Sequence, residues 1–238
     1  MSWKDILAYS ATGLLVAGHW VLFYNCIKIS TIPVALVSLS SITLFTSLLQ
    51  PLLNRQRVVL LDLVTGLVII SGIVCIVHFE ATYVLGTLTG IAAAAVASLF
   101  TVINSRFSQR ADSIVVSFYE ILGGFGGLSI IVAFYGFYTL EELSLSPSDF
   151  LYLLILGTVC TGVAYAVAIS VMQTLSPITV VLVTSLEPVY GILLSFLFFG
   201  HKQAMTSGFY LGAAIILLAV LSYPLIRNNT WQRKNFQL

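Results

Sequence analysis

The sequence predicts an all-α integral membrane protein with eight transmembrane helices. Composition is the first reason: hydrophobic residues make up 59% of the 238 residues, charged residues make up 8%, and the mean hydropathy is +1.04. Soluble domains contain about 25% charged residues. A chain with so few charges cannot cover its surface with groups that bind water, so lipid must surround most of it. The lengths of the apolar runs and the charges between them are the other two reasons.

Eight apolar runs follow one another along the chain. A transmembrane helix needs about 20 mostly apolar residues to cross about 30 Å of hydrocarbon. None of the runs alternates with a period of two, which excludes the strands of a transmembrane barrel. We expect the first run to be a retained span rather than a signal peptide, because it is long and contains His19 and Asn25. The eight runs are Ile6–Ile27, Ile32–Leu53, Val58–His78, Gly86–Ser105, Ile114–Gly136, Phe150–Met172, Ile178–Phe199 and Met205–Ile226.

The charged residues between the runs predict the orientation. An even number of spans puts both termini on one side of the membrane, and Lys and Arg collect on the cytoplasmic side. The side opposite the termini has only Lys28 and Lys202 as basic residues. We therefore expect a multi-pass protein of the cell (plasma) membrane with both termini in the cytoplasm. The side of the termini has the remaining basic residues: Lys4, Arg55, Arg57, Arg106, Arg110, Arg227, Arg233 and Lys234.

One ungapped offset of 146 residues aligns the chain with itself. From Ser30 to Val74 it gives ten identities in 45 positions, and the first three runs then overlay the last three. The last five runs thus form one complete unit. Because five is odd, two such units have opposite orientations, which is the architecture of alternating-access transporters. We expect inverted five-helix repeats with the first two helices of the first repeat missing: residues 1–78 hold its last three helices, residues 79–226 the complete second repeat, and residues 227–238 a cytoplasmic tail.

The second repeat contains four landmarks: a Tyr in the sixth span of the chain, Ser-Pro before the seventh span, Leu-Glu-Pro in the middle of the seventh, and a glycine-rich start of the eighth. They stand in TGVAYAVAISVMQTLSPITVVLVTSLEPVYGILLSFLFFG (Thr161–Gly200) and SGFYLGAAIILLAV (Ser207–Val220). With SLFTVINSRF (Ser98–Phe107), these stretches resemble the EamA-like transporter family of the drug/metabolite transporter (DMT) superfamily. The resemblance implies ten helices in two EamA repeats and transport of a small metabolite. Gly200-His201 departs from the Gly-Glu that the family often has there.

Ionisable groups at the centre of a membrane helix cost about 2.5–3.5 kcal/mol each and are functional candidates. Glu187 lies near the middle of the seventh run, and Pro188 after it removes a backbone donor, which predicts a helix break. Two interpretations of Glu187 stay open. It binds substrate or a proton, or it is a protonated side chain bonded to a neighbouring helix.

Glu120, in the fifth run, is the second candidate for proton or substrate binding, and GGFGG follows it at Gly123–Gly127. Small residues of this kind let another helix approach closely. His19 and Trp20 lie in the first run, and His19 aligns with Tyr165 under the offset of 146. We expect His19, Tyr165 and Trp20 to line a central cavity. The alternative for each of these residues is a purely structural role in helix packing.

Several classes of function are disfavoured. The chain has no G-x-S-x-G, H-E-x-x-H, G-x-x-x-x-G-K-[ST] or C-x-x-C motif, so we expect no enzyme, no catalytic residue and no cofactor. Cys26, Cys75 and Cys160 lie in apolar runs without the spacing of metal ligands, so no metal site is expected. The chain has no basic block, and nucleic acid is therefore excluded as a partner.

The expected function is a secondary transporter, a permease for a small metabolite, with proton coupling through Glu120 or Glu187. Lys and Arg are missing from every span centre, which favours neutral, zwitterionic or cationic substrates over phosphates. The expected partners are the substrate and the lipid bilayer, and a homodimer would cover the groove left by two missing helices. Two alternatives stay open: a truncated or partner-subunit membrane protein that does not transport, and an intramembrane enzyme.

Overall fold

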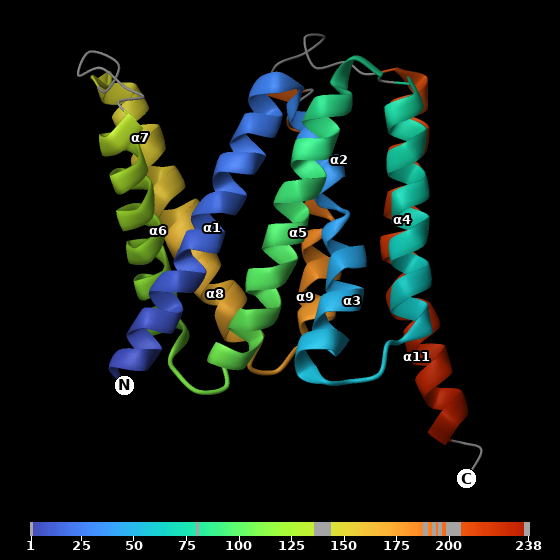
Figure 1. The fold of residues 1–238 in the computed structure, drawn as a ribbon. Helices are drawn as coiled ribbons and strands as arrows, with labels where there is room; N and C mark the ends of the chain where they lie inside the picture. The colour runs from blue at the N-terminus through green and yellow to red at the C-terminus, as the bar shows by residue number, and fades with distance from the viewer. Residues whose placement is uncertain are drawn as a thin grey trace. The chain divides into compact units, whose positions relative to one another are not determined.

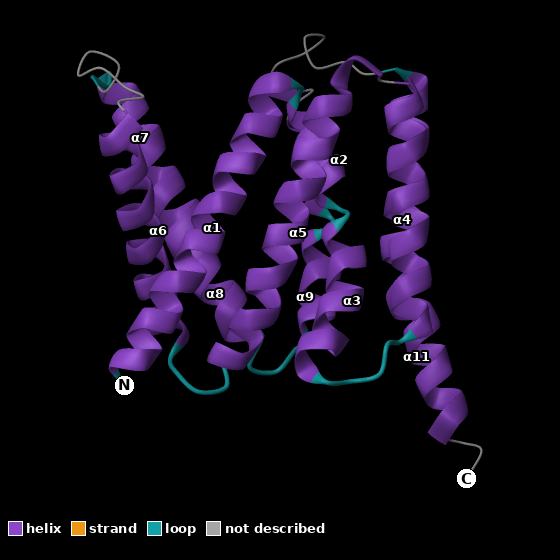
Figure 2. Ribbon diagram, in the orientation of Figure 1, coloured by secondary structure: helices purple, strands orange, loops and turns teal. Residues whose placement is uncertain are grey.

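The computed structural model describes residues 2–79, 81–135, 144–187 and 206–235, together with 190, 191, 194, 197 and 198. Within these residues the regular secondary structure is helical and contains no strand (Figures 1 and 2). Five helices are long and apolar enough to cross a membrane: Trp3–Ile29, Ile32–Asn54, Ala81–Phe107, Ser113–Phe134 and Pro147–Val171. Leu60–Ile76 and Ser207–Tyr223 are shorter apolar helices. The protein is therefore an all-α membrane protein, and the count of eight spans stays a prediction.

The chain forms two compact units. Unit 1 consists of Met1–Gly18 and Ile103–Ser176, and unit 2 consists of His19–Val102 and Pro177–Leu238. Two helices belong partly to each unit: α1 (Trp3–Ile29) begins in unit 1, and α5 (Val84–Phe107) ends in it. The boundaries of the two predicted repeats differ from those of the units, and the division into repeats stays a prediction.

Unit 1 contains α6 (Ser113–Tyr135), α7 (Pro147–Ile155), the π-helical stretch η2 (Leu156–Val163) and α8 (Ala164–Val171). The sequence explains where α7 starts. Ser146 caps the helix: its Oγ accepts from the backbone N–H of Asp149 at 3.1 Å and donates to Asp149 Oδ2 at 2.7 Å. Pro147 in the first turn has no N–H that needs a partner. Without a break, α7, η2 and α8 form one span, and α8 packs against α6.

Glycines bring α1 and α6 into direct backbone contact within unit 1. A Cβ atom on Gly13 would overlap the backbone carbonyl of Glu120, and one on Gly123 would overlap the carbonyl oxygen of Ser10. A Cβ on Gly124 would lie 2.8 Å from the carbonyl oxygen of Gly13. Such close approach of small residues is the usual basis of helix association in membranes. Gly123 and Gly124 therefore pack against α1, whereas Gly126 has no atom within 4 Å of an added Cβ.

Unit 2 contains α2 (Ile32–Leu39), α3 (Ile42–Asn54), α4 (Leu60–Phe79), η1 (Ala81–Tyr83), α9 (Pro177–Thr184) and α11 (Ser207–Asn235). In this unit α4 packs against α11 and α3. A Cβ on Gly72 would lie 2.8 Å from the carbonyl oxygen of Gly212, and one on Gly212 would lie 2.5 Å from that of Gly72. Apolar side chains of α2, α4, α9 and α11 form the core: Val34, Val37, Ile69, Ile73, Ile76, Ile178, Leu182, Phe209, Ile216, Ala219, Val220 and Tyr223.

Hydroxyl and amide groups also join the helices of unit 2. Thr43 of α3 and Ser185 at the end of α9 are hydrogen-bonded at 3.1 Å, and Thr46 bonds Ser98 of α5 at 2.8 Å. Gln50 Oε1 accepts from the backbone N–H of Ile178 at 3.0 Å and so caps α9. Hydrogen bonds between helices satisfy polar groups that lipid cannot satisfy. They explain how a core rich in Ser and Thr is stable in a membrane.

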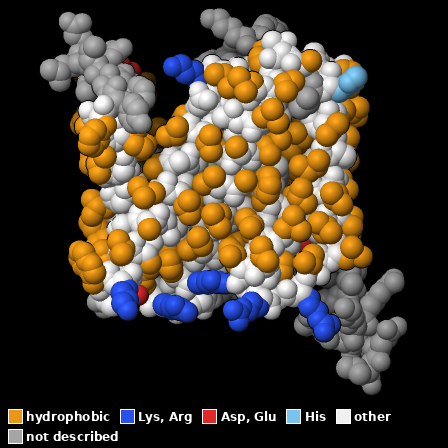
Figure 3. All heavy atoms as spheres, in the orientation of Figure 1, with side chains coloured by type: hydrophobic (Ala, Val, Ile, Leu, Met, Phe, Trp, Pro, Cys, Tyr) orange, Lys and Arg blue, Asp and Glu red, His pale blue; other side chains and the backbone are white. Residues whose placement is uncertain are grey.

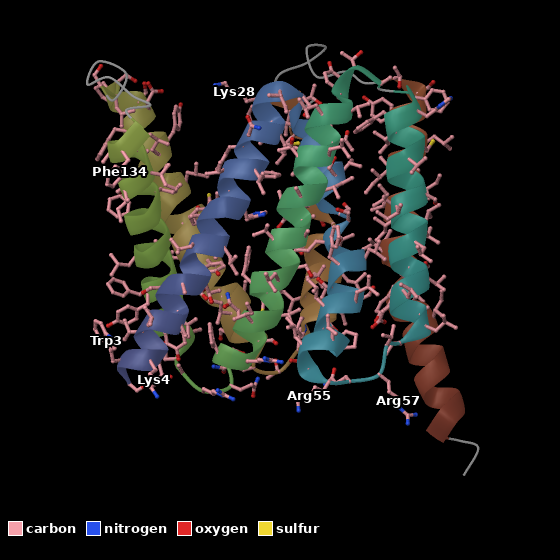
Figure 4. All side chains as sticks on the ribbon, viewed as in Figure 1. Trp3, Lys4, Lys28, Arg55, Arg57 and Phe134 are labelled. Atoms are coloured by element: carbon pink, nitrogen blue, oxygen red, sulfur yellow. The ribbon has the colours of Figure 1, made fainter. Side chains whose placement is uncertain are left out.

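The surface of each unit fits a lipid environment. Apolar side chains cover the lengths of the helices, whereas Lys and Arg side chains lie at their ends (Figure 3). In unit 2, Lys28 lies at one end of the helices, and Arg55 and Arg57 lie at the other (Figure 4). In unit 1, the Tyr9 and Phe107 rings lie 4.7 Å apart, so Lys4 and Arg106 lie at the same end.

The α1–α6 contact predicts opposite effects for two glycines on α1. Gly13→Ala should lower the free energy of unfolding by about 1–3 kcal/mol, because its Cβ meets the backbone of α6. Gly18 has no atom within 4 Å of an added Cβ. Gly18→Ala should therefore be neutral, or stabilising by up to about 1 kcal/mol. Reversible unfolding in mixed detergent micelles measures both, and equal effects of the two substitutions would contradict the contact.

Candidate functional site

Three polar side chains meet inside unit 1. Glu120 comes from α6, Asn104 from the end of α5 and Tyr165 from α8. The side chains of Glu120 and Asn104 are 0% and 1% exposed, and that of Tyr165 is half-buried. The three positions are far apart in the sequence, so the tertiary fold assembles this cluster.

Hydrogen bonds join the three side chains to one another. Tyr165 Oη donates to Glu120 Oε2 at 2.7 Å. Asn104 Nδ2 donates to the same carboxyl oxygen at 3.1 Å and to Tyr165 Oη at 2.8 Å. Glu120 Oε2 thus accepts two hydrogen bonds, one from a hydroxyl and one from an amide. Since the hydroxyl and the amide are themselves bonded, the three side chains fix one another's positions.

Two atoms of this cluster have no hydrogen-bond partner. They are Glu120 Oε1 and Asn104 Oδ1, and both are buried. Buried polar atoms are nearly always hydrogen-bonded in folded proteins, so each exception requires an explanation. Because Oε2 already has two donors, a proton on Glu120 would be held on Oε1. The cluster can therefore hold a proton, or accept a hydrogen bond from a ligand, at this oxygen.

The electrostatic surroundings of Glu120 are unusual for a carboxylate. The residues that the structure places against it, Gly13, Asn104 and Tyr165, are uncharged. An ionised carboxylate at such a place is expensive unless a cation or several donors offset its charge. No group of three or more His, Cys, Asp or Glu residues in the described part of the chain could hold a metal ion.

His19 and Trp20 belong to unit 2, at the part of α1 that follows Gly18. His19 Nδ1 lies 3.0 Å from the carbonyl oxygen of Ala93 on α5. Since a carbonyl only accepts, Nδ1 is the donor in this bond. The His19 ring also meets Phe100 edge-on at 5.6 Å. These contacts are those of a residue that joins two helices. The predicted cavity between His19 and Tyr165 stays a prediction, since the two residues belong to different units.

Glu187 also belongs to unit 2, after the turn that ends α9. Its side chain is exposed, whereas Leu186 before it packs against the core of unit 2. Pro188, the predicted helix break, lies outside the described residues. The structure does bring together Glu120 and Tyr165, two of the predicted site residues, but it does not bring Glu187 to them within one unit. The role of Glu187 in binding stays a prediction.

Two polar residues of the spans were missing from the sequence-based candidates. Asn104 is one residue from the end of its apolar run, and an amide inside a span was the signal that could have identified it. Asp62, on the first turn of α4, is 8% exposed and accepts a hydrogen bond from Tyr223 Oη at 2.6 Å. Its position close to the end of an apolar run made it resemble an interfacial charge.

Removing the Tyr165 hydroxyl tests the hydrogen bonds of the cluster. Tyr165→Phe should lower the free energy of unfolding by about 1.5–3 kcal/mol, because a buried carboxyl oxygen loses its closest donor. Tyr152 is 69% exposed on α7 of the same unit and offers a matched control. Denaturant titration in micelles compares the two, and a loss of stability no larger than that of Tyr152→Phe would argue against the bond.

Comparisons with known proteins agree with the fold and with the resemblance. The profile of the EamA-like transporter family matches residues 84–223, more than half of the chain. One solved structure, described only as the crystal structure of a protein, is similar with a TM-score of 0.67 at 20% identity, over 97% of this chain and 79% of the other. No curated protein matches the chain. At 20% identity the structural likeness shows the fold alone, whereas the profile match identifies the family. The protein belongs to the EamA-like transporter family.

Proposed function

We propose that the protein is a multi-pass secondary transporter that moves a small metabolite and couples this movement to protons at Glu120. The observation that carries the proposal is the buried carboxyl group of Glu120, which has two donors on Oε2 and none on Oε1. A group that binds and releases a proton needs such a free oxygen. Ionisable residues within spans mark ion and substrate pathways, and the family is one of transporters.

The energy source follows from the motifs. The sequence has no phosphate-binding G-x-x-x-x-G-K-[ST] loop, so transport would use the gradient of a solute or an ion. A proton gradient requires a group that changes its protonation inside the membrane. Glu120 supplies one in unit 1, and Glu187 is a second carboxylate in an apolar run of unit 2.

Inverted repeats form the architectural part of the proposal: eight spans, three from one five-helix repeat and five from the other. Two short helices support it. Helices α2 (Ile32–Leu39) and α9 (Pro177–Thr184) both end in the middle of an apolar run. The offset of 146 residues aligns these two helices to within one residue. Interrupted helices at matching positions of two repeats are characteristic of transporter binding sites. The hydrogen bond between Thr43 and Ser185 joins the two interruptions.

We also propose that the protein lies in the plasma membrane with both termini in the cytoplasm. The basic residues of each unit support this orientation. In unit 2, Arg55 and Arg57 lie at the end opposite Lys28. In unit 1, Arg106 lies at the end where α1 begins, which is also the end of Lys4. The ends with more basic residues are the cytoplasmic ones under the positive-inside rule.

Reconstitution into liposomes with an imposed pH gradient tests the transport function. A panel of labelled neutral, zwitterionic and cationic metabolites should include at least one that accumulates when the gradient is present, whereas a sugar phosphate should not. Glu120→Gln should abolish the gradient-driven part of this accumulation, because an amide cannot carry the proton. Asp62→Asn is the matched control: it removes a buried carboxylate that also accepts from a tyrosine, but in unit 2.

The outcomes separate the parts of the proposal. If no metabolite accumulates, the proposed transport is wrong. If Glu120→Gln accumulates solute as the unaltered protein does, Glu120 is not the coupling residue. Glu187→Gln tests the second carboxylate in the same assay, and a loss of pH dependence there would assign the coupling to unit 2.

A further inference from the structure

The two atoms without partners in unit 1 are both hydrogen-bond acceptors. Glu120 Oε1 and Asn104 Oδ1 are buried and have no donor. The remaining polar atoms of the same groups are already engaged. Glu120 Oε2 accepts from two donors, and Asn104 Nδ2 donates to both Glu120 Oε2 and Tyr165 Oη. What this cluster can bind is therefore a group that donates.

The direction of the Asn104 amide follows from its neighbours. If its nitrogen and oxygen were exchanged, the amide oxygen would lie 3.1 Å from Glu120 Oε2, and two acceptors would face each other. With Nδ2 in that place, both contacts of the amide are hydrogen bonds. The unpartnered amide atom is thus the oxygen. Since the two groups are in direct contact, both free oxygens belong to the same polar cluster.

The charge of the site favours a cation. Glu120 carries the carboxyl group of the cluster, and its two hydrogen-bond donors, Asn104 and Tyr165, are uncharged. A positively charged ligand would offset the charge that the protein leaves uncompensated. A ligand that has several N–H groups as well as a charge would satisfy both free acceptors and the carboxylate at once.

We propose that unit 1 recognises its substrate by a primary ammonium group. One N–H donates to Glu120 Oε1 and a second donates to Asn104 Oδ1. The inference rests on the proposed transport function and adds the substrate class to it. A quaternary ammonium ion has the same charge but no N–H, so it leaves both acceptors without a donor. Because the side chain of Glu120 is 0% exposed, the ammonium reaches it only in a more open conformation of the protein.

The proton and the ammonium compete for one oxygen. When Glu120 carries its proton on Oε1, the arrival of R–NH₃⁺ breaks that O–H bond, the proton leaves to water, and the carboxylate pairs with the ammonium. One positive charge enters the site and one leaves it, so the charge of the site is conserved. The other titratable side chains of the surrounding cluster are Tyr165 from α8, Tyr9 from α1 and Tyr119 from α6.

Proton release on binding tests this proposal directly. The full chain is placed in phosphatidylcholine nanodiscs, whose headgroup has no N–H, in weakly buffered solution with a pH indicator. The probes are n-butylammonium and its N,N,N-trimethyl counterpart, which have the same charge and the same alkyl chain. We expect n-butylammonium to release up to one proton per chain, at concentrations at least about tenfold lower than the trimethyl compound requires.

Variants assign the effect to the two acceptors. Glu120→Gln should abolish the proton release. Asn104→Leu should remove the preference for the primary amine, because one of the two acceptors is lost. Asp62→Asn should retain both the release and the preference, and circular dichroism confirms that each variant is folded.

Three results would overturn the proposal: equal proton release by the two probes, release that persists in Glu120→Gln, or no release with n-butylammonium at any concentration. An unchanged preference in folded Asn104→Leu would remove Asn104 from recognition. The same experiments can contradict ammonium recognition without contradicting the proposed transport function. Gradient-driven uptake of a metabolite without an amine, lost in Glu120→Gln, would support transport while it contradicts ammonium recognition.

Discussion

The direct contact between α1 and α6 is the constraint on which the structure of unit 1 depends. At Gly13 the backbone of α1 reaches the carbonyl of Glu120 itself, so the glycine and the carboxylate occupy the same level of the unit. A side chain at this position of α1 would force the helices apart. Without one, α1 covers α6 at the turn where an ionisable residue enters the apolar interior, and lipid cannot provide the hydrogen bonds that water would. The close approach of α1 therefore helps to bury the polar cluster that Glu120 forms with Asn104 and Tyr165.

The two units satisfy the hydrogen bonds of their buried polar groups in different ways. In unit 2 many hydroxyls are buried, and most bond a carbonyl of their own helix or a hydroxyl of another one, as Thr46 and Ser98 do. The buried carboxylate of Asp62 there has a tyrosine donor, like that of Glu120. Glu120 differs because its second oxygen is both buried and without a partner, and neither oxygen of Asp62 is among such atoms. A completely satisfied polar group is compatible with a structural role, whereas a buried free acceptor beside a bonded one has a capacity for binding that packing alone does not require.

The extent to which the sequence predicts the fold depends on the type of feature. The ends of the apolar runs predict the ends of two helices to within a few residues. Ile114–Gly136 corresponds to α6 (Ser113–Tyr135), and Gly86–Ser105 corresponds to α5 (Val84–Phe107). This success has a simple reason, because a backbone in lipid has almost no alternative to the helix. Leu186-Glu187-Pro188 and its flanking stretches pointed to the correct family. Glu120 stood out in the sequence because a carboxylate in an apolar run is costly, yet nothing local indicated which residues would bond it.

The sequence by itself determined that lipid surrounds the protein, that its secondary structure is helical, and which family it belongs to. All three depend on which residues are apolar and in what order. Only the tertiary structure decided which polar residues meet. Tyr165 lies 45 positions from Glu120, and Asn104 lies 61 positions from Tyr165, so their hydrogen bonds exist because helices from different parts of the chain pack together. Tyr165 resembled a symmetry mate of His19, but its hydroxyl bonds a carboxylate instead. The physical reason is that hydrogen bonds depend on distances of about 3 Å in space, and helix packing, not sequence order, sets those distances.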